Sequence, residues 1–310
     1  MILYYAMGGG LGHLARARAV AHTLGLRDRE RVTLVTASPH ARDARVVAGF
    51  DVLHAPLELA GNRVEFQGWL RAALDQLRPS AIYVDTFPAG VIGELAGLPF
   101  PAGAPLYHLA RLLRWPEYEG QLVGIPSVYP AYATSYLLEP LAEEHEVFLR
   151  ERSQEIRPLE LEDPPAPAAD VPEQLAELRS ADRPVWMIVH SGPGSEIMEL
   201  VAYARELRSV EATEGSDPRL VVIAPHQPVE LPAAVLRLDV YPATHLFPLA
   251  DRLITACDFN VMRETIPHRD RHRFRPFERR FDDQFLRAAR RRGEVGQTPP
   301  PAPPPRGEGS

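Results

Sequence analysis

A histidine behind a run of glycines is the first group in this sequence that can do chemistry. His13 follows the glycine-rich segment 7–12 and begins a stretch whose apolar residues recur at helical spacing. An imidazole with an ordinary pKa of about 6.5 can accept a proton from a hydroxyl at neutral pH. Asp85, at the end of a short apolar run, can hold the other ring nitrogen. The pair predicts general-base catalysis. The alternative, that His13 packs against the turn and Asp85 caps a helix, is equally open.

Two similar series of elements are expected to position these groups. Each half opens with a short apolar run, then a glycine turn, then a helical pattern. In the first half we expect strands at 2–6, 31–36 and 81–84, with a helix from Pro88 to near Gly97. In the second we expect strands at 185–189, 220–224, 235–240, 253–255 and 273–274, and a helix at 197–207. This alternation predicts an α/β protein of two Rossmann-like domains whose parallel sheets face each other across a ligand-binding cleft.

Proline-rich segments set the expected domain boundaries. We predict an N-terminal domain at 1–157, a proline-rich linker at 158–183, a C-terminal domain at 184–295 and a disordered tail at 296–310.

The glycine turns indicate anion binding, although the first one is not a dinucleotide fingerprint. His13 stands where the third glycine would be, and the strand at 31–36 does not end in the acidic residue that would hold a cofactor ribose. The backbone amides of Gly10 and Gly12 can still approach a diphosphate. A second small-residue turn, before the second-half helix, offers another such site and contains Ser191, Gly192 and Ser195.

Three segments resemble two-domain glycosyltransferases of the B fold (GT-B). The opening MGGGLGHLARARAVAHTL is similar to bacterial enzymes that glycosylate the lipid precursor of peptidoglycan. IYVDTFPAGVIGELAGL resembles a segment of plant nucleotide-sugar glycosyltransferases. VYPATHLFPLADRLITACDFNVMRETIPHRDRHRFRPFERRFDDQ resembles their nucleotide-sugar signature. The resemblance implies a catalytic base at His13 with Asp85 as its partner.

The same resemblance implies a set of donor-binding residues. Asn260 falls where the family contacts the diphosphate, and Glu264 where it binds the ribose hydroxyls. Asp283 and Gln284 fall on the pair that holds the donor sugar. The segment from Tyr241 to Thr244 matches the region that borders the nucleobase. The alternatives are a helix-surface position for Glu264 beside Arg263, and a charge pair of Asp282 and Asp283 at a helix N-terminus.

Asp258 departs from the family pattern, which has glycine there. Its carboxylate would face a diphosphate, and two like charges ~4 Å apart repel by roughly 4 kcal/mol at an effective dielectric of ~20. Loss of the glycine also predicts strain if the turn needs positive φ. The chain has no lysine and no acidic metal-binding triplet, so we expect neither a metal nor a cofactor.

These observations predict an inverting glycosyltransferase of the hexosyltransferase type that takes a nucleotide-diphosphate sugar, such as a UDP-sugar, as donor. The alternatives are a non-catalytic relative weakened by Asp258, or a nucleotide-sugar epimerase or hydrolase on the same fold. The acceptor is not identified, and no nucleic-acid partner is expected. Segment 263–292 has eleven arginines against five acidic residues and can meet phosphates, an anionic membrane surface or the acidic remainder of the chain. We expect a cytoplasmic protein, because no secretory signal or membrane span is evident.

Overall fold

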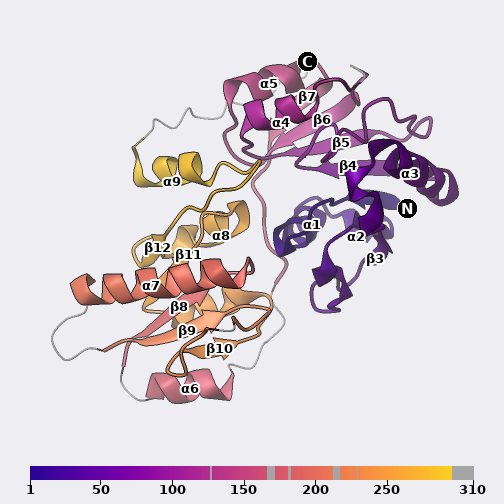
Figure 1. The fold of residues 1–310 in the computed structure, drawn as a ribbon. Coiled ribbons are helices and arrows are strands. Elements are labelled where there is room, and N and C mark those ends of the chain that lie inside the picture. Colours follow the sequence, from indigo (N-terminus) through magenta and orange to yellow (C-terminus); the bar gives the residue numbers. More distant parts are fainter. Residues whose placement is uncertain (126–127, 166–171, 181–182, 212–216, 229, 295–310) are drawn as a thin grey trace, which may run out of the picture.

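The computed structural model describes residues 1–125, 128–165, 172–180, 183–211, 217–228 and 230–294. Two parallel sheets organise this part of the chain (Figure 1). The first has seven strands in the order β3-β2-β1-β4-β5-β6-β7, and the second has five in the order β10-β9-β8-β11-β12. The predicted α/β architecture of two Rossmann-like units is therefore confirmed.

The first lobe consists of the seven-stranded sheet and the helices around it. Its strands are β1 (Ile2–Tyr5), β2 (Val32–Thr36), β3 (Asp51–His54), β4 (Ala81–Asp85), β5 (Leu106–Ala110), β6 (Tyr132–Leu137) and β7 (Ser153–Pro158). Its α-helices are α1 (Leu11–Thr23), α2 (Leu26–Arg29), α3 (Arg63–Leu77), α4 (Trp115–Gln121) and α5 (Glu143–Arg150). Alternate residues of β1 point to opposite faces, so Tyr4 packs with Leu34 and Val20 on one side while Leu3 and Tyr5 pack on the other.

The second lobe is built in the same way around the five-stranded sheet. Its strands are β8 (Val185–Val189), β9 (Arg219–Ile223), β10 (Leu236–Leu238), β11 (Arg252–Thr255) and β12 (His272–Phe274). Its helices are α6 (Glu173–Ser180), α7 (Gly194–Glu211) and α8 (Phe259–Glu264), and α9 (Gln284–Arg292) follows them. Trp186 and Ile188 of β8 pack with α7, while Met187 packs on the opposite face with Leu175 of α6.

Two sequence-based expectations need correction. The predicted helix between Pro88 and Gly97 is absent, because the segment forms turns. The turns surround the buried carboxylate of Glu94, which accepts hydrogen bonds from the amides of Val91 and Ile92 at 2.9 and 2.8 Å. Helix α6 lies inside the range predicted as a linker, because Leu175 packs into the second core. The predicted tail at 296–310 lies outside the described residues.

Candidate functional site

His13 and Asp85 meet where two neighbouring parallel strands end. Helix α1 begins directly after the glycine turn that follows β1, and His13 lies in its first turn. Asp85 is the last residue of β4, which pairs with β1. The Nδ1 atom of His13 lies 2.6 Å from Oδ2 of Asp85, whose side chain is fully buried. The structure thus brings together the two residues that the sequence paired.

Gly8 makes room for the imidazole ring. A Cβ atom placed on Gly8 would lie 2.3 Å from both Nε2 and Cδ2 of His13, far inside van der Waals contact. The ring also stacks on Phe87 with centroids 6.2 Å apart. These contacts fix the ring and leave its side chain 13 % exposed.

Arg16 is a third member of this group that the sequence reasoning missed. Its Nε donates to Oδ1 of Asp85 and its Nη2 donates to Oδ2, both at 2.6 Å. Nη2 also donates to the Thr86 hydroxyl at 2.8 Å. The available signal was its position three residues after His13, on the same face of α1.

The electrostatics of this group suit a neutral imidazole. Burial alone would raise the pKa of Asp85, but Arg16 and His13 hold it well below its usual range. Burial lowers the pKa of His13 from its ordinary value, although Asp85 acts in the opposite direction. Because the ionised carboxylate accepts the Nδ1 proton, Nε2 carries a lone pair, and it has no hydrogen-bond partner among the described residues. This nitrogen can accept a proton.

A cleft between the lobes lies beside His13, with an empty volume of about 1170 Å³ including its open mouth. The first lobe contributes one face of α1, including Gly12 and Arg18. The second contributes residues that follow the carboxyl ends of its strands, namely His190, Ser191, Tyr241, Thr244, Asp258, Asn260 and Glu264. His13 is the neighbour of Gly12 and lies next to this space rather than in its lining.

Glu264 and Tyr241 both line the cleft. Burial raises the pKa of Glu264 to about 7, with Arg263 acting in the opposite direction. Arg18 of the first lobe lies over the Tyr241 ring, 5.2 Å from its centroid. Glu264 lines the cleft with a side chain that is 16 % exposed, so it does not lie on an open helix surface.

Asn260 connects the two lobes. Its side-chain nitrogen donates to the carbonyl oxygen of Gly12 at 2.8 Å, while its Oδ1 is buried without a partner in the described chain. The residue predicted to contact a diphosphate thus also holds the glycine turn that carries His13. Gly10, in the same turn, is exposed, and its carbonyl lies 3.4 Å from the Ser38 hydroxyl.

The three residues predicted from the second small-residue turn do not all line the cleft. Ser191 lines the cleft, whereas Ser195 is exposed in the first turn of α7. A Cβ atom on Gly192 would lie 2.3 Å from Nε2 of His190, so this glycine leaves room for that ring. Gly192 and Ser195 are not among the cleft-lining residues.

The predicted sugar-holding pair makes contacts within the protein. Gln284 is fully buried, and its Oε1 accepts hydrogen bonds from the amides of Cys257 and Phe277 at 3.3 and 2.9 Å. Its Nε2 donates to Asp258 at 2.7 Å. Asp283 caps α9 by accepting the Leu286 amide proton at 2.9 Å. A sugar-binding role for either residue stays a prediction.

Asp258 sits in a relaxed backbone conformation. Its φ and ψ are −65° and 147°, which any residue adopts, so the expected strain from the missing glycine is wrong. Its side chain is 44 % exposed, lines the cleft and lies within 4.0 Å of His190.

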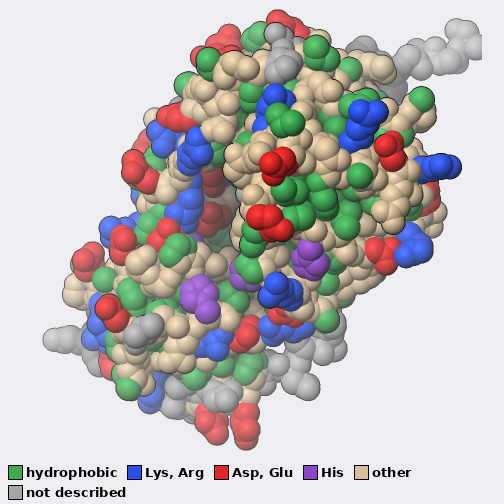
Figure 2. All heavy atoms as spheres, turned by 45° about the vertical axis from the view of Figure 1, so that its right-hand side comes forward, with side chains coloured by type: hydrophobic (Ala, Val, Ile, Leu, Met, Phe, Trp, Pro, Cys, Tyr) green, Lys and Arg blue, Asp and Glu red, His purple; other side chains and the backbone are tan. Residues whose placement is uncertain are grey.

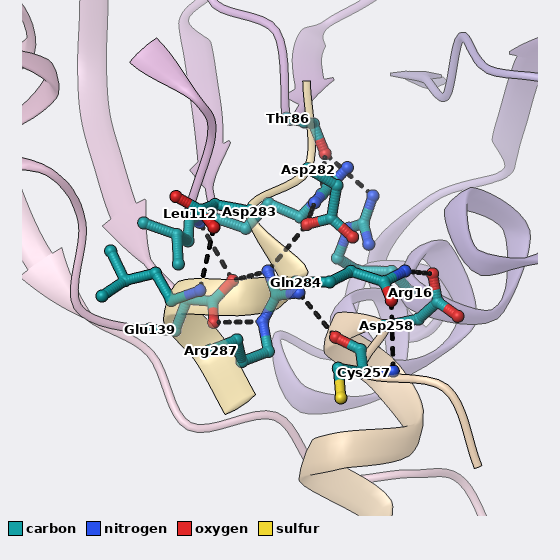
Figure 3. A network of polar contacts seen from close by, with 12 residues as sticks. Arg16, Thr86, Leu112, Glu139, Cys257, Asp258, Asp282, Asp283, Gln284 and Arg287 are labelled. Carbon is teal, nitrogen blue, oxygen red and sulfur yellow. Dashed lines mark hydrogen bonds and ion pairs between the residues drawn. The ribbon is translucent and has the colours of Figure 1, made fainter. Parts of the chain in front are cut away.

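A buried ion-pair network, which the sequence did not reveal, ties α9 to the first lobe (Figure 3). Arg287 donates two hydrogen bonds to Glu139 and one to Asp282, each 2.8 Å long. Asp282 also accepts a 2.5 Å hydrogen bond from Arg111, whose Nε lies 3.1 Å from the Thr86 hydroxyl. The hydroxyl of Thr86, next to Asp85, therefore accepts hydrogen bonds from two arginines: Arg16, which also holds Asp85, and Arg111 of the α9 network.

Many arginines of segment 263–292 form ion pairs within the protein. Several of its members pair with carboxylates from other elements: Arg263 with Asp163, Arg273 with Glu211, Arg275 with Glu199, Arg279 with Glu196 and Arg287 with Glu139. On the face in Figure 2, arginines and acidic side chains are interspersed. Of the three expected partners of this segment, the acidic remainder of the chain is the one that these pairs favour.

Two kinds of feature are absent from the described residues. Among them, no helix combines the length and apolarity that crossing a bilayer requires. In the same part of the chain, no three histidine, cysteine or acidic side chains converge closely enough to hold a metal ion by themselves.

Comparison with solved structures identifies the architecture. No protein-family model matches the chain, and no curated protein matches its sequence. The glycosyltransferase SnogD from Streptomyces nogalater is 17% identical with a TM-score of 0.55, and the match covers 90% of this chain and 82% of that one. SsfS6 from Streptomyces sp. SF2575, solved with thymidine diphosphate, gives 12% identity, coverage of 94% and 85%, and a TM-score of 0.57. The glycosyltransferase VinC, in complex with dTDP, gives 15% identity, coverage of 94% and 84%, and a TM-score of 0.51. The chain therefore has the two-domain GT-B fold of these glycosyltransferases.

Proposed function

We propose that this protein is an inverting glycosyltransferase of the hexosyltransferase type that takes a nucleoside diphosphate sugar as donor. The observation that carries the proposal is the 2.6 Å contact between His13 and the buried Asp85 beside the interlobe cleft. The GT-B fold supports it, and two of the similar structures contain a thymidine diphosphate. Fold alone does not fix chemistry, so the proposal depends on the geometry of these residues.

The proposed reaction begins at Nε2 of His13. This nitrogen takes the proton of an acceptor hydroxyl while the hydroxyl oxygen attacks the anomeric carbon of the donor. The bond between that carbon and the diphosphate oxygen breaks, and its electron pair leaves with the nucleoside diphosphate. Attack from the side opposite the leaving group inverts the anomeric configuration. Asp85 stabilises the imidazolium that forms and, with Arg16, keeps the ring in position.

The donor is proposed to lie along the second-lobe wall of the cleft. Glu264, which lines this wall, can accept hydrogen bonds from ribose hydroxyls in its ionised form. Tyr241 and Thr244 supply an aromatic face and a hydroxyl near the base, while Ser191 supplies a hydroxyl near the diphosphate. Asn260 links this wall to the turn beneath His13.

The decisive experiment separates binding from chemistry. Thermal unfolding is measured with uridine or thymidine diphosphate, and release of nucleoside diphosphate from the corresponding sugar donors is measured with water as acceptor. His13→Ala is expected to keep the nucleotide-induced stabilisation and to lose ~10²–10⁴-fold in turnover. Unchanged turnover in His13→Ala would disprove the base assignment, and the absence of any nucleotide-induced shift would remove the donor site.

A non-catalytic nucleotide-sugar-binding protein is the second candidate. Asp258 favours it, because its carboxylate lines the cleft where a diphosphate would have to lie. Stabilisation by nucleotide without turnover of any donor, in wild type as in His13→Ala, would select this candidate.

A further inference from the structure

Thr86 lies between two residues that hold the proposed base. Asp85, before it, contacts Nδ1 of His13, and Phe87, after it, stacks on the same ring. The Phe87 amide donates to the Asp85 carbonyl at 2.8 Å and closes a three-residue turn with Thr86 at its centre. The φ angle of Thr86 is 69°, in the left-handed region that a β-branched residue rarely adopts. Three-residue turns with positive φ at the centre are the rare, strained form of the γ-turn.

The neighbouring strand β5 holds the backbone of this turn. Thr86 is fully buried, and its amide donates to the carbonyl oxygen of Leu109 at 3.0 Å. Its own carbonyl oxygen, which can only accept, lies 3.1 Å from Nε2 of His108. Both partners belong to β5, which pairs with β4. A strained conformation persists only where the surrounding structure determines it, and these contacts do so for the backbone.

The Thr86 hydroxyl is held by two guanidinium groups (Figure 3). It accepts hydrogen bonds from Arg16 at 2.8 Å and from Arg111 at 3.1 Å, and it lies 3.4 Å from Oδ2 of Asp85. Arg16 also binds both oxygens of Asp85, and Arg111 is paired with Asp282. A hydroxyl has two acceptor lone pairs and one donor, so these three contacts use its whole capacity. The hydroxyl therefore ties the strained turn to the groups that surround the Asp85 carboxylate.

We infer that Thr86 is a positioning residue for the proposed base: its strained turn sets Asp85 and Phe87 around the His13 ring, and its hydroxyl fixes that turn. This inference rests on the proposed function. Thr86 is not among the residues that line the cleft, so it acts through its two neighbours and not on the substrate. Its substitution is therefore expected to change turnover and to leave donor binding as it is.

Steady-state kinetics of nucleoside diphosphate release by Thr86→Val and Thr86→Ser test the role of the hydroxyl. Valine keeps the branched shape and loses the acceptor, whereas serine keeps the hydroxyl and loses a methyl group. Thr86→Val is expected to lower kcat at least about tenfold with an unchanged KM for the donor, because the base is misplaced. Thr86→Ser should stay within about threefold of wild type, because the hydroxyl remains. A role in packing alone would give the opposite order, since serine leaves a cavity.

Thr33→Val is the matched control for these two variants. Thr33 is buried in β2 of the same sheet, away from the turn, and should keep the wild-type kcat when its hydroxyl is replaced. The rise in unfolding temperature that uridine or thymidine diphosphate causes should be the same in wild type and in Thr86→Val. Loss of that rise in Thr86→Val would overturn the inference, because the residue would then act on the fold or on donor binding.

Urea unfolding of Thr86→Gly and Thr86→Ala tests the strain without relying on activity. Both variants lack the hydroxyl, but only alanine must hold a side chain at positive φ. Thr86→Gly is therefore expected to unfold at the higher urea concentration, although glycine is the less stable residue where φ is negative. The reverse order would overturn the strained turn.

The kinetic outcomes separate this inference from the proposed function. A wild-type kcat in Thr86→Val, or equal losses in Thr86→Val and Thr86→Ser, would overturn the positioning role and leave the glycosyltransferase proposal standing. Absence of turnover in the wild-type protein would overturn both.

Discussion

At the scale of single residues, the space above Gly8 decides where His13 lies. We predict that Gly8→Ala, whose Cβ would lie 2.3 Å from Nε2, displaces the ring and lowers turnover by roughly 10²-fold. The positive φ of Gly8, 156°, adds strain for any L-residue. Gly9→Ala is the control, because nothing lies within 4 Å of its Cβ position. Steady-state kinetics of nucleoside diphosphate release measure both, and equal turnover of the two variants would contradict the prediction.

The protonation of His13 predicts the acidic side of the pH profile. Burial lowers the His13 pKa, and the neutral ring is the active base, so the ring stays active below its ordinary pKa of about 6.5. Activity is then lost as pH falls through the lowered value. We expect kcat at saturating donor to stay constant from pH 8 to about 6.5 and to fall only below it, whereas kcat/KM also falls near pH 7, because Glu264 is protonated there and no longer accepts hydrogen bonds from the ribose. An acidic limb of kcat at pH 7 or above would contradict the assignment.

Of the two residues that hold the His13 ring, Asp85 could be identified from the sequence and Arg16 could not. His13 and Asp85 both follow apolar runs, and parallel neighbouring strands place their carboxyl ends at one edge of the sheet. Pattern and topology together therefore predict that they meet. Arg16 was missed, because an arginine on a helix is usually exposed, and only the tertiary structure shows that it is 3 % exposed and bound to Asp85.

At the scale of elements, α9 is fixed by a buried guanidinium. Arg287 is 7 % exposed and pairs with Glu139 and Asp282. We predict that Arg287→Met lowers the free energy of unfolding by about 3–5 kcal/mol, because it leaves buried carboxylates short of a partner. Arg292→Met, on the same helix but 46 % exposed, should change it by less than about 1 kcal/mol. Urea unfolding at pH 7 measures both, and similar losses in the two variants would refute a special role for Arg287.

The same network predicts how acid affects stability. Burial opposes ionisation of Asp282, but Arg111 and Arg287 hold its pKa well below its usual range. A depressed carboxyl pKa contributes stability that is fully present above the unfolded pKa of about 3.9 and is lost as pH falls through the native value. Arg287→Met should therefore show a smaller loss of unfolding free energy between pH 5 and pH 3 than wild type shows.

Elements with strong local patterns were predictable, and those fixed by distant contacts were not. Strands β1, β4, β8 and β11 are apolar runs bounded by turns, and their predicted ranges agree with the structure within a residue or two. Strands β3, β5, β6 and β7 were missed, because polar or aromatic residues interrupt short segments. The segment after Pro88 reads as a helix, but Glu94 is buried against the Tyr5 hydroxyl at 2.5 Å. That contact is 89 residues away in sequence and overrides the local preference.

At the scale of the whole molecule, the chain crosses back from the second lobe to the first before α9. Leu113 and Asp282 form an antiparallel bridge, and the Arg114 amide donates to the carbonyl of Phe281 at 2.8 Å. The Phe281 ring packs edge-on against Phe87, which stacks on His13. The lobe expected to bind the donor therefore contacts the residues around the proposed base directly.

This crossing predicts that the two lobes unfold together. Separation of the lobes breaks the Arg287–Glu139, Arg111–Asp282 and Asn260–Gly12 contacts at once, so neither sheet is expected to unfold while the other keeps them. Hydrogen exchange in a urea series reports each sheet separately within one protein. Amides of β4 and β8 should lose protection at the same urea concentration in wild type, whereas in Arg287→Met those of β8 should lose it first, because the smaller second sheet then depends on its own core. Separate midpoints in the wild-type protein would show that the lobes are independent and that the crossing does not couple them.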